Sequence, residues 1–155
     1  MDDRQYLSEA VTLAQESVEN GGGPFGSLIV RDGEIIGRGC NCVTGDNDPT
    51  AHAEIVAIRA ACQTIEHFSL KGSTIYASCE PCPMCLAAAY WARVDRIVYA
   101  ASAEQIAAAG FDDVVIEQEM ALPVAQRSIP MERITLESVE KLFSMWEQKE
   151  DKIRY

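Results

Sequence analysis

Two short segments decide the fold expected for this chain: NDPTAHAE at residues 47–54 and CEPCPMC at residues 79–85. Each leads into a predicted helix. Apolar residues at helical spacing follow the first segment over residues 52–65, and an alanine-rich helical pattern follows the second over residues 83–93. Strand-like runs flank both helices, so these segments mark where a sheet and its covering helices meet.

Apolar runs around the two segments predict one mixed sheet. Strands are expected over residues 27–31, 34–40, 73–79 and 97–100. Asp32-Gly33 separates the first two strands, and this dipeptide between apolar runs is a strong signal for an antiparallel hairpin. The last two strands enclose a helix, which predicts parallel strands joined by a right-handed crossover. We therefore predict a three-layer α/β/α fold with the hairpin at one edge of the sheet.

Helical patterns fill most of the remaining chain. Residues 3–19 place Leu7, Val11, Ala14 and Val18 on one face, after acidic residues that can cap the first turn. Residues 41–50 are rich in turn formers and are expected to form a loop. Short helices are expected at residues 102–109 and 114–122, an extended connection with two prolines at 123–131, and a final helix at 138–150.

His52, Cys82 and Cys85 have the residue types and the spacing of a catalytic zinc site. Such a zinc keeps three protein ligands and leaves its fourth position for water, and one imidazole with two thiolates is a suitable set. Glu54 lies two residues after His52, so at a helix start its carboxylate can address the same point as a general base. It can take a proton from the water, whose pKa falls to about 7 in such sites, and pass it to a leaving amine.

Other interpretations of these cysteines stay open at this point. A single CxxC pair could be a redox pair or half of a structural zinc site. Cys79 repeats the three-residue spacing of Cys82 and Cys85, and with His52 it could complete a closed Cys3His site that is only structural. Glu54 favours the catalytic alternative, because a closed site would not use it. The alternation over residues 74–78 also reads as a strand that carries Cys79 towards the core.

Length and charge restrict the function further. A chain of 155 residues suits one domain that buries about 70% of its unfolded surface, and we expect a single domain over residues 1–155. With 13 basic and 24 acidic residues the net charge is −11, which repels a nucleic-acid backbone. No leader or membrane-spanning run is visible, and the six cysteines read best as reduced thiols and metal ligands. We therefore expect a cytoplasmic protein without a nucleic-acid or membrane partner.

The motifs also resemble those of a known family. The pattern His-x-Glu followed by Pro-Cys-x-x-Cys is the signature of zinc-dependent nucleobase deaminases. HAE and PCPMC specify only this superfamily, whereas GGPFG at residues 22–26, AYWAR, AGFDD and the terminal tyrosine resemble the bacterial guanine deaminases of the cytidine-deaminase-like superfamily. The resemblance covers essentially the whole chain. It implies that superfamily's fold, one Zn²⁺ per subunit, and hydrolytic deamination of guanine to xanthine and ammonia.

The resemblance further implies a set of substrate contacts. Asn41 and Asp113 would hold the ring, with the Asp113 carboxylate accepting hydrogen bonds from ring N–H donors of guanine, while Phe25, Trp91 and Tyr155 would contribute aromatic contacts. Each has a plainer interpretation from the sequence alone: a residue after a glycine-rich connection (Phe25), a turn residue (Asn41), a core or interface aromatic (Trp91), a helix cap (Asp112 or Asp113) and a frayed terminus (Tyr155).

Assembly is also implied by the resemblance alone. In the family the C-terminal segment crosses to the partner subunit and closes its active site with the terminal tyrosine. We therefore expect a domain-swapped homodimer in which about residues 123–155 are exchanged, and the proline-bearing connection suits such an exchange.

Several alternative functions stay open. A guanine nucleoside, an ammeline-type triazine or cytosine could be the substrate of the same zinc chemistry. A tRNA adenosine deaminase shares HAE and PCxMC, but the acidic charge weighs against it. A non-catalytic zinc protein with the closed Cys3His site is the alternative from another functional class.

Overall fold

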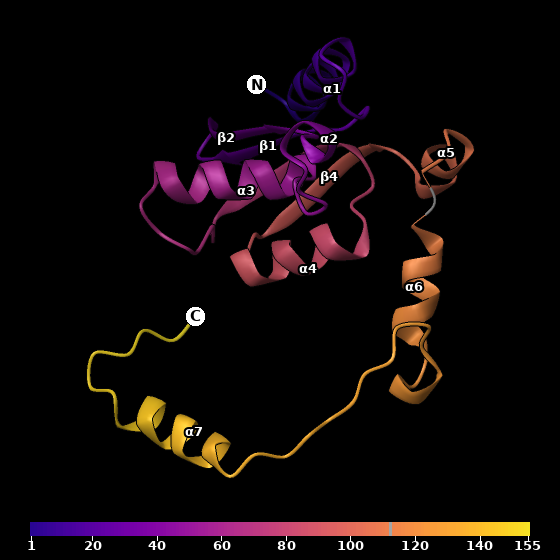
Figure 1. Ribbon diagram of the computed structural model, residues 1–155. Coiled ribbons are helices and arrows are strands. Elements are labelled where there is room, and N and C mark those ends of the chain that lie inside the picture. The colour runs from indigo at the N-terminus through magenta and orange to yellow at the C-terminus, as the bar shows by residue number, and fades with distance from the viewer. Residues whose placement is uncertain (112) are drawn as a thin grey trace. The chain divides into compact units, whose positions relative to one another are not determined.

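A mixed sheet forms the centre of the N-terminal part of the chain in this computed structural model, which describes residues 1–111 and 113–155 (Figure 1). Its strands lie in the order β2-β1-β3-β4. β1 pairs antiparallel with both β2 and β3, whereas β3 and β4 are parallel. The predicted mixed sheet with an edge hairpin is confirmed. The strand bounds are Gly26–Arg31 (β1), Glu34–Cys40 (β2), Ser73–Cys79 (β3) and Arg96–Ala101 (β4).

The turn between β1 and β2 has the backbone that its sequence predicts. Asp32 and Gly33 both have positive φ angles, 52° and 80°. Two positive φ values suit a primed two-residue turn, whose twist matches that of the flanking strands. Arg31 therefore pairs with Glu34, and the register set by that pair shifts once, between Val30 and Ile29.

Helix α1 (Asp3–Glu19) covers one face of the sheet. The predicted apolar face is wrong, because most of the buried residues lie one position before the predicted ones in the sequence. Of the predicted residues only Ala14 is buried, and Val18 is 52% exposed. The reason is the partner strand: a Cβ at Gly26 would lie 2.2 Å from the Ala10 carbonyl oxygen, so small residues must face this contact. The buried residues of α1 are Tyr6, Ala10, Ala14 and Ser17.

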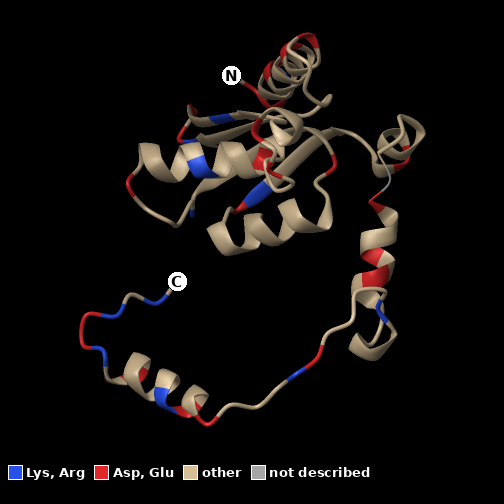
Figure 2. Cartoon of the chain, viewed as in Figure 1, with Lys and Arg blue, Asp and Glu red and all other residues tan. Residues whose placement is uncertain are grey.

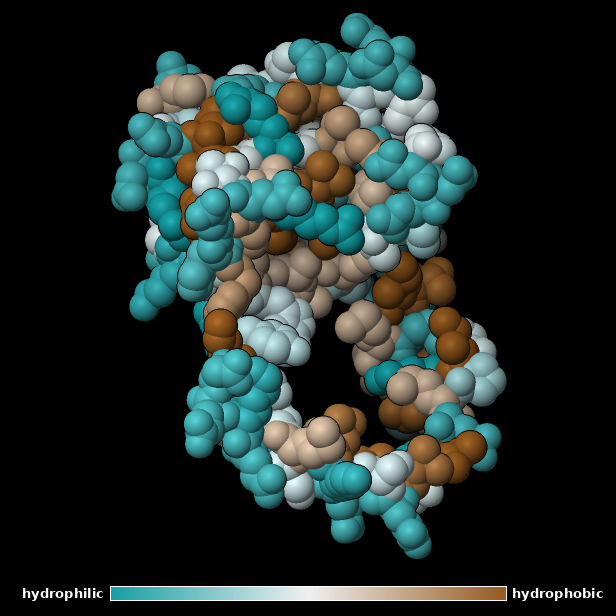
Figure 3. Space-filling model, turned by 60° about the vertical axis from the view of Figure 1, so that its left-hand side comes forward, coloured by the Kyte–Doolittle hydropathy of each residue, from teal (hydrophilic) through white to brown (hydrophobic). Residues whose placement is uncertain are grey.

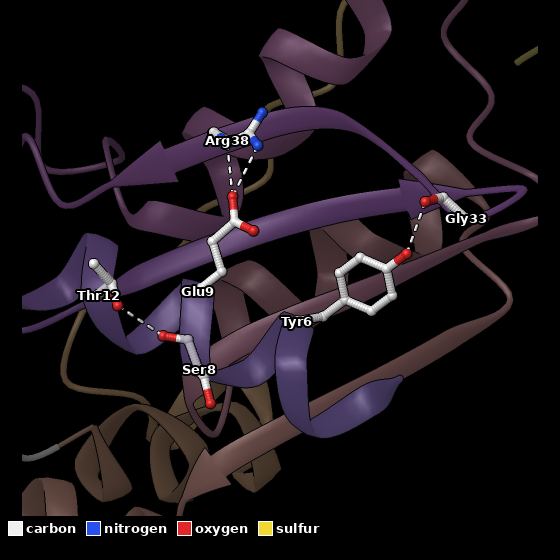
Figure 4. A network of polar contacts seen from close by, with 6 residues as sticks. All are labelled: Tyr6, Ser8, Glu9, Thr12, Gly33 and Arg38. Atoms are coloured by element: carbon white, nitrogen blue, oxygen red, sulfur yellow. Dashed lines mark hydrogen bonds and ion pairs between the residues drawn. The ribbon is translucent and has the colours of Figure 1, made fainter. Parts of the chain in front are cut away.

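Polar contacts fix α1 across the hairpin. The Tyr6 hydroxyl donates to the Gly33 carbonyl oxygen over 2.7 Å, directly at the turn. The Arg38 guanidinium donates two hydrogen bonds to one carboxylate oxygen of Glu9, at 2.8 and 3.1 Å (Figure 4). The helix is therefore tied to the hairpin turn and to β2.

Helices α3 (Ala53–Thr64) and α4 (Pro83–Ala92) cover the other face, which gives the three layers. Glycines in β2 let α3 approach closely: a Cβ at Gly39 would lie 2.2 Å from the Ala53 carbonyl oxygen, and one at Gly37 would lie 2.4 Å from that of Ala57. This contact fixes the start of α3 on the sheet. The core beneath both helices consists of Ile29, Ala57, Ala61, Leu70, Ile75, Ala77, Ala89 and Ala92.

Residues 41–50, predicted as a loop, contain the one-turn helix α2 (Val43–Asp46). Asn47 ends it in the left-handed conformation, with a φ of 52°. Turn-forming residues are compatible with a single helical turn as well as with a loop, so composition did not separate the two. Further along, α5 (Ala103–Ala108) follows β4 as predicted.

The chain divides into two compact units, residues 1–113 and 114–155. The second contains α6 (Val114–Ala121), the 3-10 turn η1 (Val124–Gln126) and α7 (Ser138–Gln148). Figure 3 shows brown, apolar side chains at the surface of this unit. Among its exposed large apolar residues are Val115, Ile116, Met120, Ile129, Ile134, Leu142, Phe143 and Met145. The expectation of a single domain with an exchanged C-terminal segment stays a prediction.

Throughout residues 1–111 and 113–155, each helix is too short or too polar to span a bilayer.

Gly39→Ala should destabilise the protein by about 1–3 kcal/mol, the usual cost of overpacking a core contact. The added methyl group would collide with the backbone of α3. Urea unfolding measures the change. Gly45→Ala is the matched control, because a Cβ there meets nothing within 4 Å. Equal stability of the two variants would show that α3 does not need this close approach.

Candidate zinc and substrate site

His52, Cys82 and Cys85 converge at one point in the N-terminal unit. Their ligand atoms all lie within 4.8 Å of one another. His52 is the N-cap of α3 and Cys82 is the N-cap of α4, while Cys85 lies in the first turn of α4. Two helices that start at the same point of the sheet thus bring together residues 30 positions apart. The donor set of one imidazole and two thiols fits a tetrahedral zinc with an open fourth position.

The electrostatics of this group favour a metal. The pKa of Cys82 is lowered to about 4, first by a hydrogen bond from Cys85 and then by His52. The Cys82 Sγ lies 3.6 Å from the His52 Nδ1. The contact with Cys82 in turn raises the pKa of His52, and Cys85, which holds its proton towards Cys82 in a buried position, has a raised pKa. The lowered pKa of Cys82 favours the thiolate, which is the form of cysteine that binds zinc.

Glu54 lies in the first turn of α3 and lines the same cavity as His52 and Cys82. Its side chain is only 7% exposed, and this burial raises the pKa of its carboxyl group. A raised pKa makes the carboxylate a stronger base and moves the group towards the range in which general acids and bases work best. Glu54 is not part of the metal-ligand group formed by the described residues. The arrangement suits a general acid and base beside the metal.

Cys79 points to a different contact. Its thiol donates to the Pro24 carbonyl oxygen over 3.9 Å and accepts a hydrogen bond from the Ser78 hydroxyl over 3.6 Å. Burial raises the pKa of this thiol. Within the described residues the metal-ligand group therefore consists of three side chains without Cys79, and the closed Cys3His site is not favoured.

A cavity of about 470 Å³ opens beside two of the three ligands, His52 and Cys82. This volume lies in the range typical of small-molecule sites, about 300–1,000 Å³. Three of the predicted substrate contacts, Phe25, Asn41 and Asp113, line it together with Glu54. The structure thus brings two carboxyl groups, an amide and an aromatic ring to one space.

Backbone contacts hold Asn41 at the rim of this cavity. Its N–H donates to the Phe25 carbonyl oxygen over 3.1 Å, and its side-chain oxygen accepts from the Val43 N–H over 3.4 Å. The Ser17 hydroxyl donates to the Asn41 carbonyl oxygen over 3.3 Å. The turn-residue interpretation and the substrate-binding interpretation are therefore compatible, since the long Val43 contact leaves the amide able to bind a ligand as well.

Trp91 and Tyr155 are not among the residues that line this cavity. Trp91 is on α4 and is 66% exposed, and Tyr155 is in the C-terminal unit and is 72% exposed. Their substrate contacts stay predictions. Asp112, considered as a helix cap, lies outside the described residues.

Sequence reasoning missed other residues of the cavity wall. Phe111 lines the cavity and meets Phe25 edge to face, with ring centroids 4.9 Å apart. Glu80 and Ile106 line it as well. Phe111 falls within the AGFDD motif and Glu80 within CEPCPMC, two motifs that the sequence analysis already connected with the site. Their spacing did not indicate that their side chains would face the cavity.

Comparison with known proteins gives consistent similarities. The family model of the cytidine and deoxycytidylate deaminase zinc-binding region matches residues 1–101. Guanine deaminase of Bacillus subtilis is 48% identical over the full length of both chains, and its crystal structure matches with a TM-score of 0.97, covering 100% of this chain and 99% of that one.

More distant similarities cover less of the chain. The tRNA-specific adenosine deaminase of Bacillus subtilis is 38% identical over 99 residues, which is 64% of this chain and 62% of that protein. A structure of guanine deaminase from Nitrosomonas europaea is 28% identical, with a TM-score of 0.66, and covers 70% of this chain and 63% of that one.

Cys82→Ala should abolish stoichiometric zinc binding, because it removes the thiolate whose pKa is already low. Zinc per chain after dialysis, measured by atomic emission, gives the result. Cys79→Ala is the matched control and should keep one zinc, bound by two sulfur atoms and lighter atoms in X-ray absorption. Loss of zinc from the Cys79 variant would establish the closed site.

Proposed function

This chain belongs to the cytidine and deoxycytidylate deaminase family of zinc-binding proteins, and from that membership we propose that it hydrolyses guanine to xanthine and ammonia. One observation carries the choice of guanine. The similarity to a guanine deaminase runs through the whole chain, including the C-terminal unit, whereas the general family model ends at residue 101.

The side chains at the site supply the proton transfers of this reaction. His52, Cys82 and Cys85 would hold the zinc, which would supply a Lewis acid and a bound water whose pKa falls to about 7 in such sites. Glu54 would take a proton from the attacking water as the water oxygen bonds to C2 of guanine, and would pass it to N3. It would then take the second proton from the new C2 hydroxyl group and give it to the amine, so that the C2–N bond breaks, ammonia leaves and C2 becomes a carbonyl carbon. Burial supports this role, because a raised pKa lets the carboxyl group hold the proton between transfers.

The cavity wall offers groups that match guanine. The Asp113 carboxylate can accept hydrogen bonds from ring N–H donors, a pattern that adenine and cytosine do not present. The Asn41 amide can both donate and accept, and Phe25 offers an aromatic ring. In this assignment Glu54 and the zinc ligands carry the chemistry, while Asn41 and Asp113 fix the orientation of the ring.

A nucleic-acid substrate fits the molecule less well. The net charge is −11, and Figure 2 shows the Lys and Arg residues of the N-terminal unit scattered singly over the fold. Binding of a phosphate backbone depends on clustered basic side chains. A free base of low charge is therefore the better substrate, and we place the enzyme in the cytoplasm, where a reducing environment keeps zinc-binding thiols available.

The C-terminal unit supports the proposal of an exchanged homodimer. Many of its large apolar side chains are exposed within the single chain, among them Leu142 and Phe143 of α7. Extended apolar surfaces of this kind usually bind another protein surface. We assign that role to a second copy of the chain, with Tyr155 closing the partner's active site.

Glu54→Gln should keep zinc but lower kcat for guanine by about 10²–10⁴-fold, because the carboxamide cannot transfer protons. Ammonia release and zinc content are measured on the same preparation. Glu34→Gln, an exposed position in the hairpin turn, is the control and should be fully active. Near-normal turnover by the Glu54 variant would contradict the assignment of the acid and base.

Co-expression of Glu54→Gln with Tyr155→Ala chains tests the exchange. If the tail serves the partner, one site of each mixed dimer combines an intact Glu54 with an intact Tyr155 and regains activity. Each variant alone should be impaired. Mixed dimers as inactive as the separate variants would show that Tyr155 serves its own chain or that no exchange occurs.

A further inference from the structure

Glu80 lines the substrate cavity but has no role in the assignments above. It lies between the last residue of β3 and the zinc-binding turn at Cys82, and it is half-buried. A charged side chain in this position is costly unless it is hydrogen-bonded. Its contacts therefore indicate what it does.

Both the backbone and the side chain of Glu80 bind the segment that follows β4. The Glu80 N–H donates to the Ala101 carbonyl oxygen over 2.8 Å, which extends the pairing of β3 with β4 by one contact. The Glu80 Oε2 accepts a hydrogen bond from the Ala103 N–H over 3.0 Å. Ala103 is the first residue of α5. The carboxylate thus joins the zinc-binding turn to the start of this helix.

Helix α5 carries one wall of the cavity. Ile106 in α5 is 8% exposed and lines the cavity. The Phe111 N–H donates to the Ile106 carbonyl oxygen over 3.2 Å, and the Gly110 N–H donates to that of Ala107 over 2.9 Å. These bonds attach Phe111 to the end of α5, and Asp113, two residues later in the sequence, lines the same cavity. A shift of α5 would therefore move the side chains that face the substrate.

We propose that Glu80 is a positioning residue, whose carboxylate holds the wall of Ile106, Phe111 and Asp113 at a fixed distance from the zinc ligands. This inference rests on the proposed function of the same site. The hydrogen bond from Ala103 needs an acceptor and no negative charge, so glutamine can replace glutamate in this role. A carboxylate that acted directly on the substrate through its charge would not tolerate the same change.

The test compares Glu80→Gln, Glu80→Ala and the control Glu104→Ala in zinc-loaded protein. Glu104 follows Ala103 in the first turn of α5 and carries the same charge as Glu80, but it is exposed and does not line the cavity. Glu80→Ala should raise KM for guanine by about tenfold and lower kcat/KM by about 10–100-fold, because misplaced contacts weaken binding and orientation. Glu80→Gln should stay within about threefold of wild type, since its carboxamide oxygen keeps the hydrogen bond. Glu104→Ala should be unchanged, and all should keep one zinc.

Hydrogen exchange of peptides over residues 103–111 gives a readout that does not depend on catalysis. In Glu80→Ala the amides of these peptides should exchange faster than in wild type. In Glu80→Gln they should be as well protected as in wild type. Unchanged exchange and kinetics in Glu80→Ala would overturn the proposal. So would a Glu80→Gln variant that is protected but as slow as Glu80→Ala, because charge would then be the requirement. If wild type failed on guanine, the proposed function would fail, and the exchange data alone would decide the role of Glu80.

Discussion

The meeting of one imidazole and two thiols within 4.8 Å is the constraint on which the rest of the structure depends. It requires that α3 and α4 begin at the same point of the sheet. Gly39 permits this for α3, because its missing side chain lets the helix backbone approach β2. The proline at the first turn of α4 and the parallel pairing of β3 with β4 fix the other helix. Metal affinity and fold stability should therefore be coupled, as in other proteins that complete a zinc site on folding.

Much of this arrangement could be predicted from the sequence, because it follows from local patterns. The Asp32-Gly33 turn, the approximate strand bounds and the helix starts near His52 and Pro83 depend on interactions between residues that are close in sequence. The buried face of α1 could not be predicted, since it depends on how closely the helix approaches Gly26 in the strand that follows it. The spacing of the cysteines likewise could not show that the Cys79 thiol contacts the Pro24 carbonyl oxygen, whereas Cys82 and Cys85 lie beside His52.

The residues of the cavity wall come from other parts of the fold than the zinc ligands. The zinc ligands and Glu54 lie at the starts of α3 and α4, and all of them belong to the signature of the superfamily. The groups proposed to select guanine belong to connecting segments: Asn41 follows β2, and Asp113 follows α5. Loops of this kind commonly determine specificity on a shared scaffold. Reaction type and substrate choice are thus separable in this fold, and Glu80 links the two parts.

Ammonia release from guanine, guanosine, cytosine, adenine and ammeline, each supplied separately to the zinc-loaded protein at one concentration, tests the central claim most directly. The account predicts turnover of guanine far above that of the other four compounds. Preferential turnover of a different ring would keep the roles of zinc and Glu54 but contradict those of Asn41 and Asp113. Failure to release ammonia from any of the five would contradict the catalytic assignment itself.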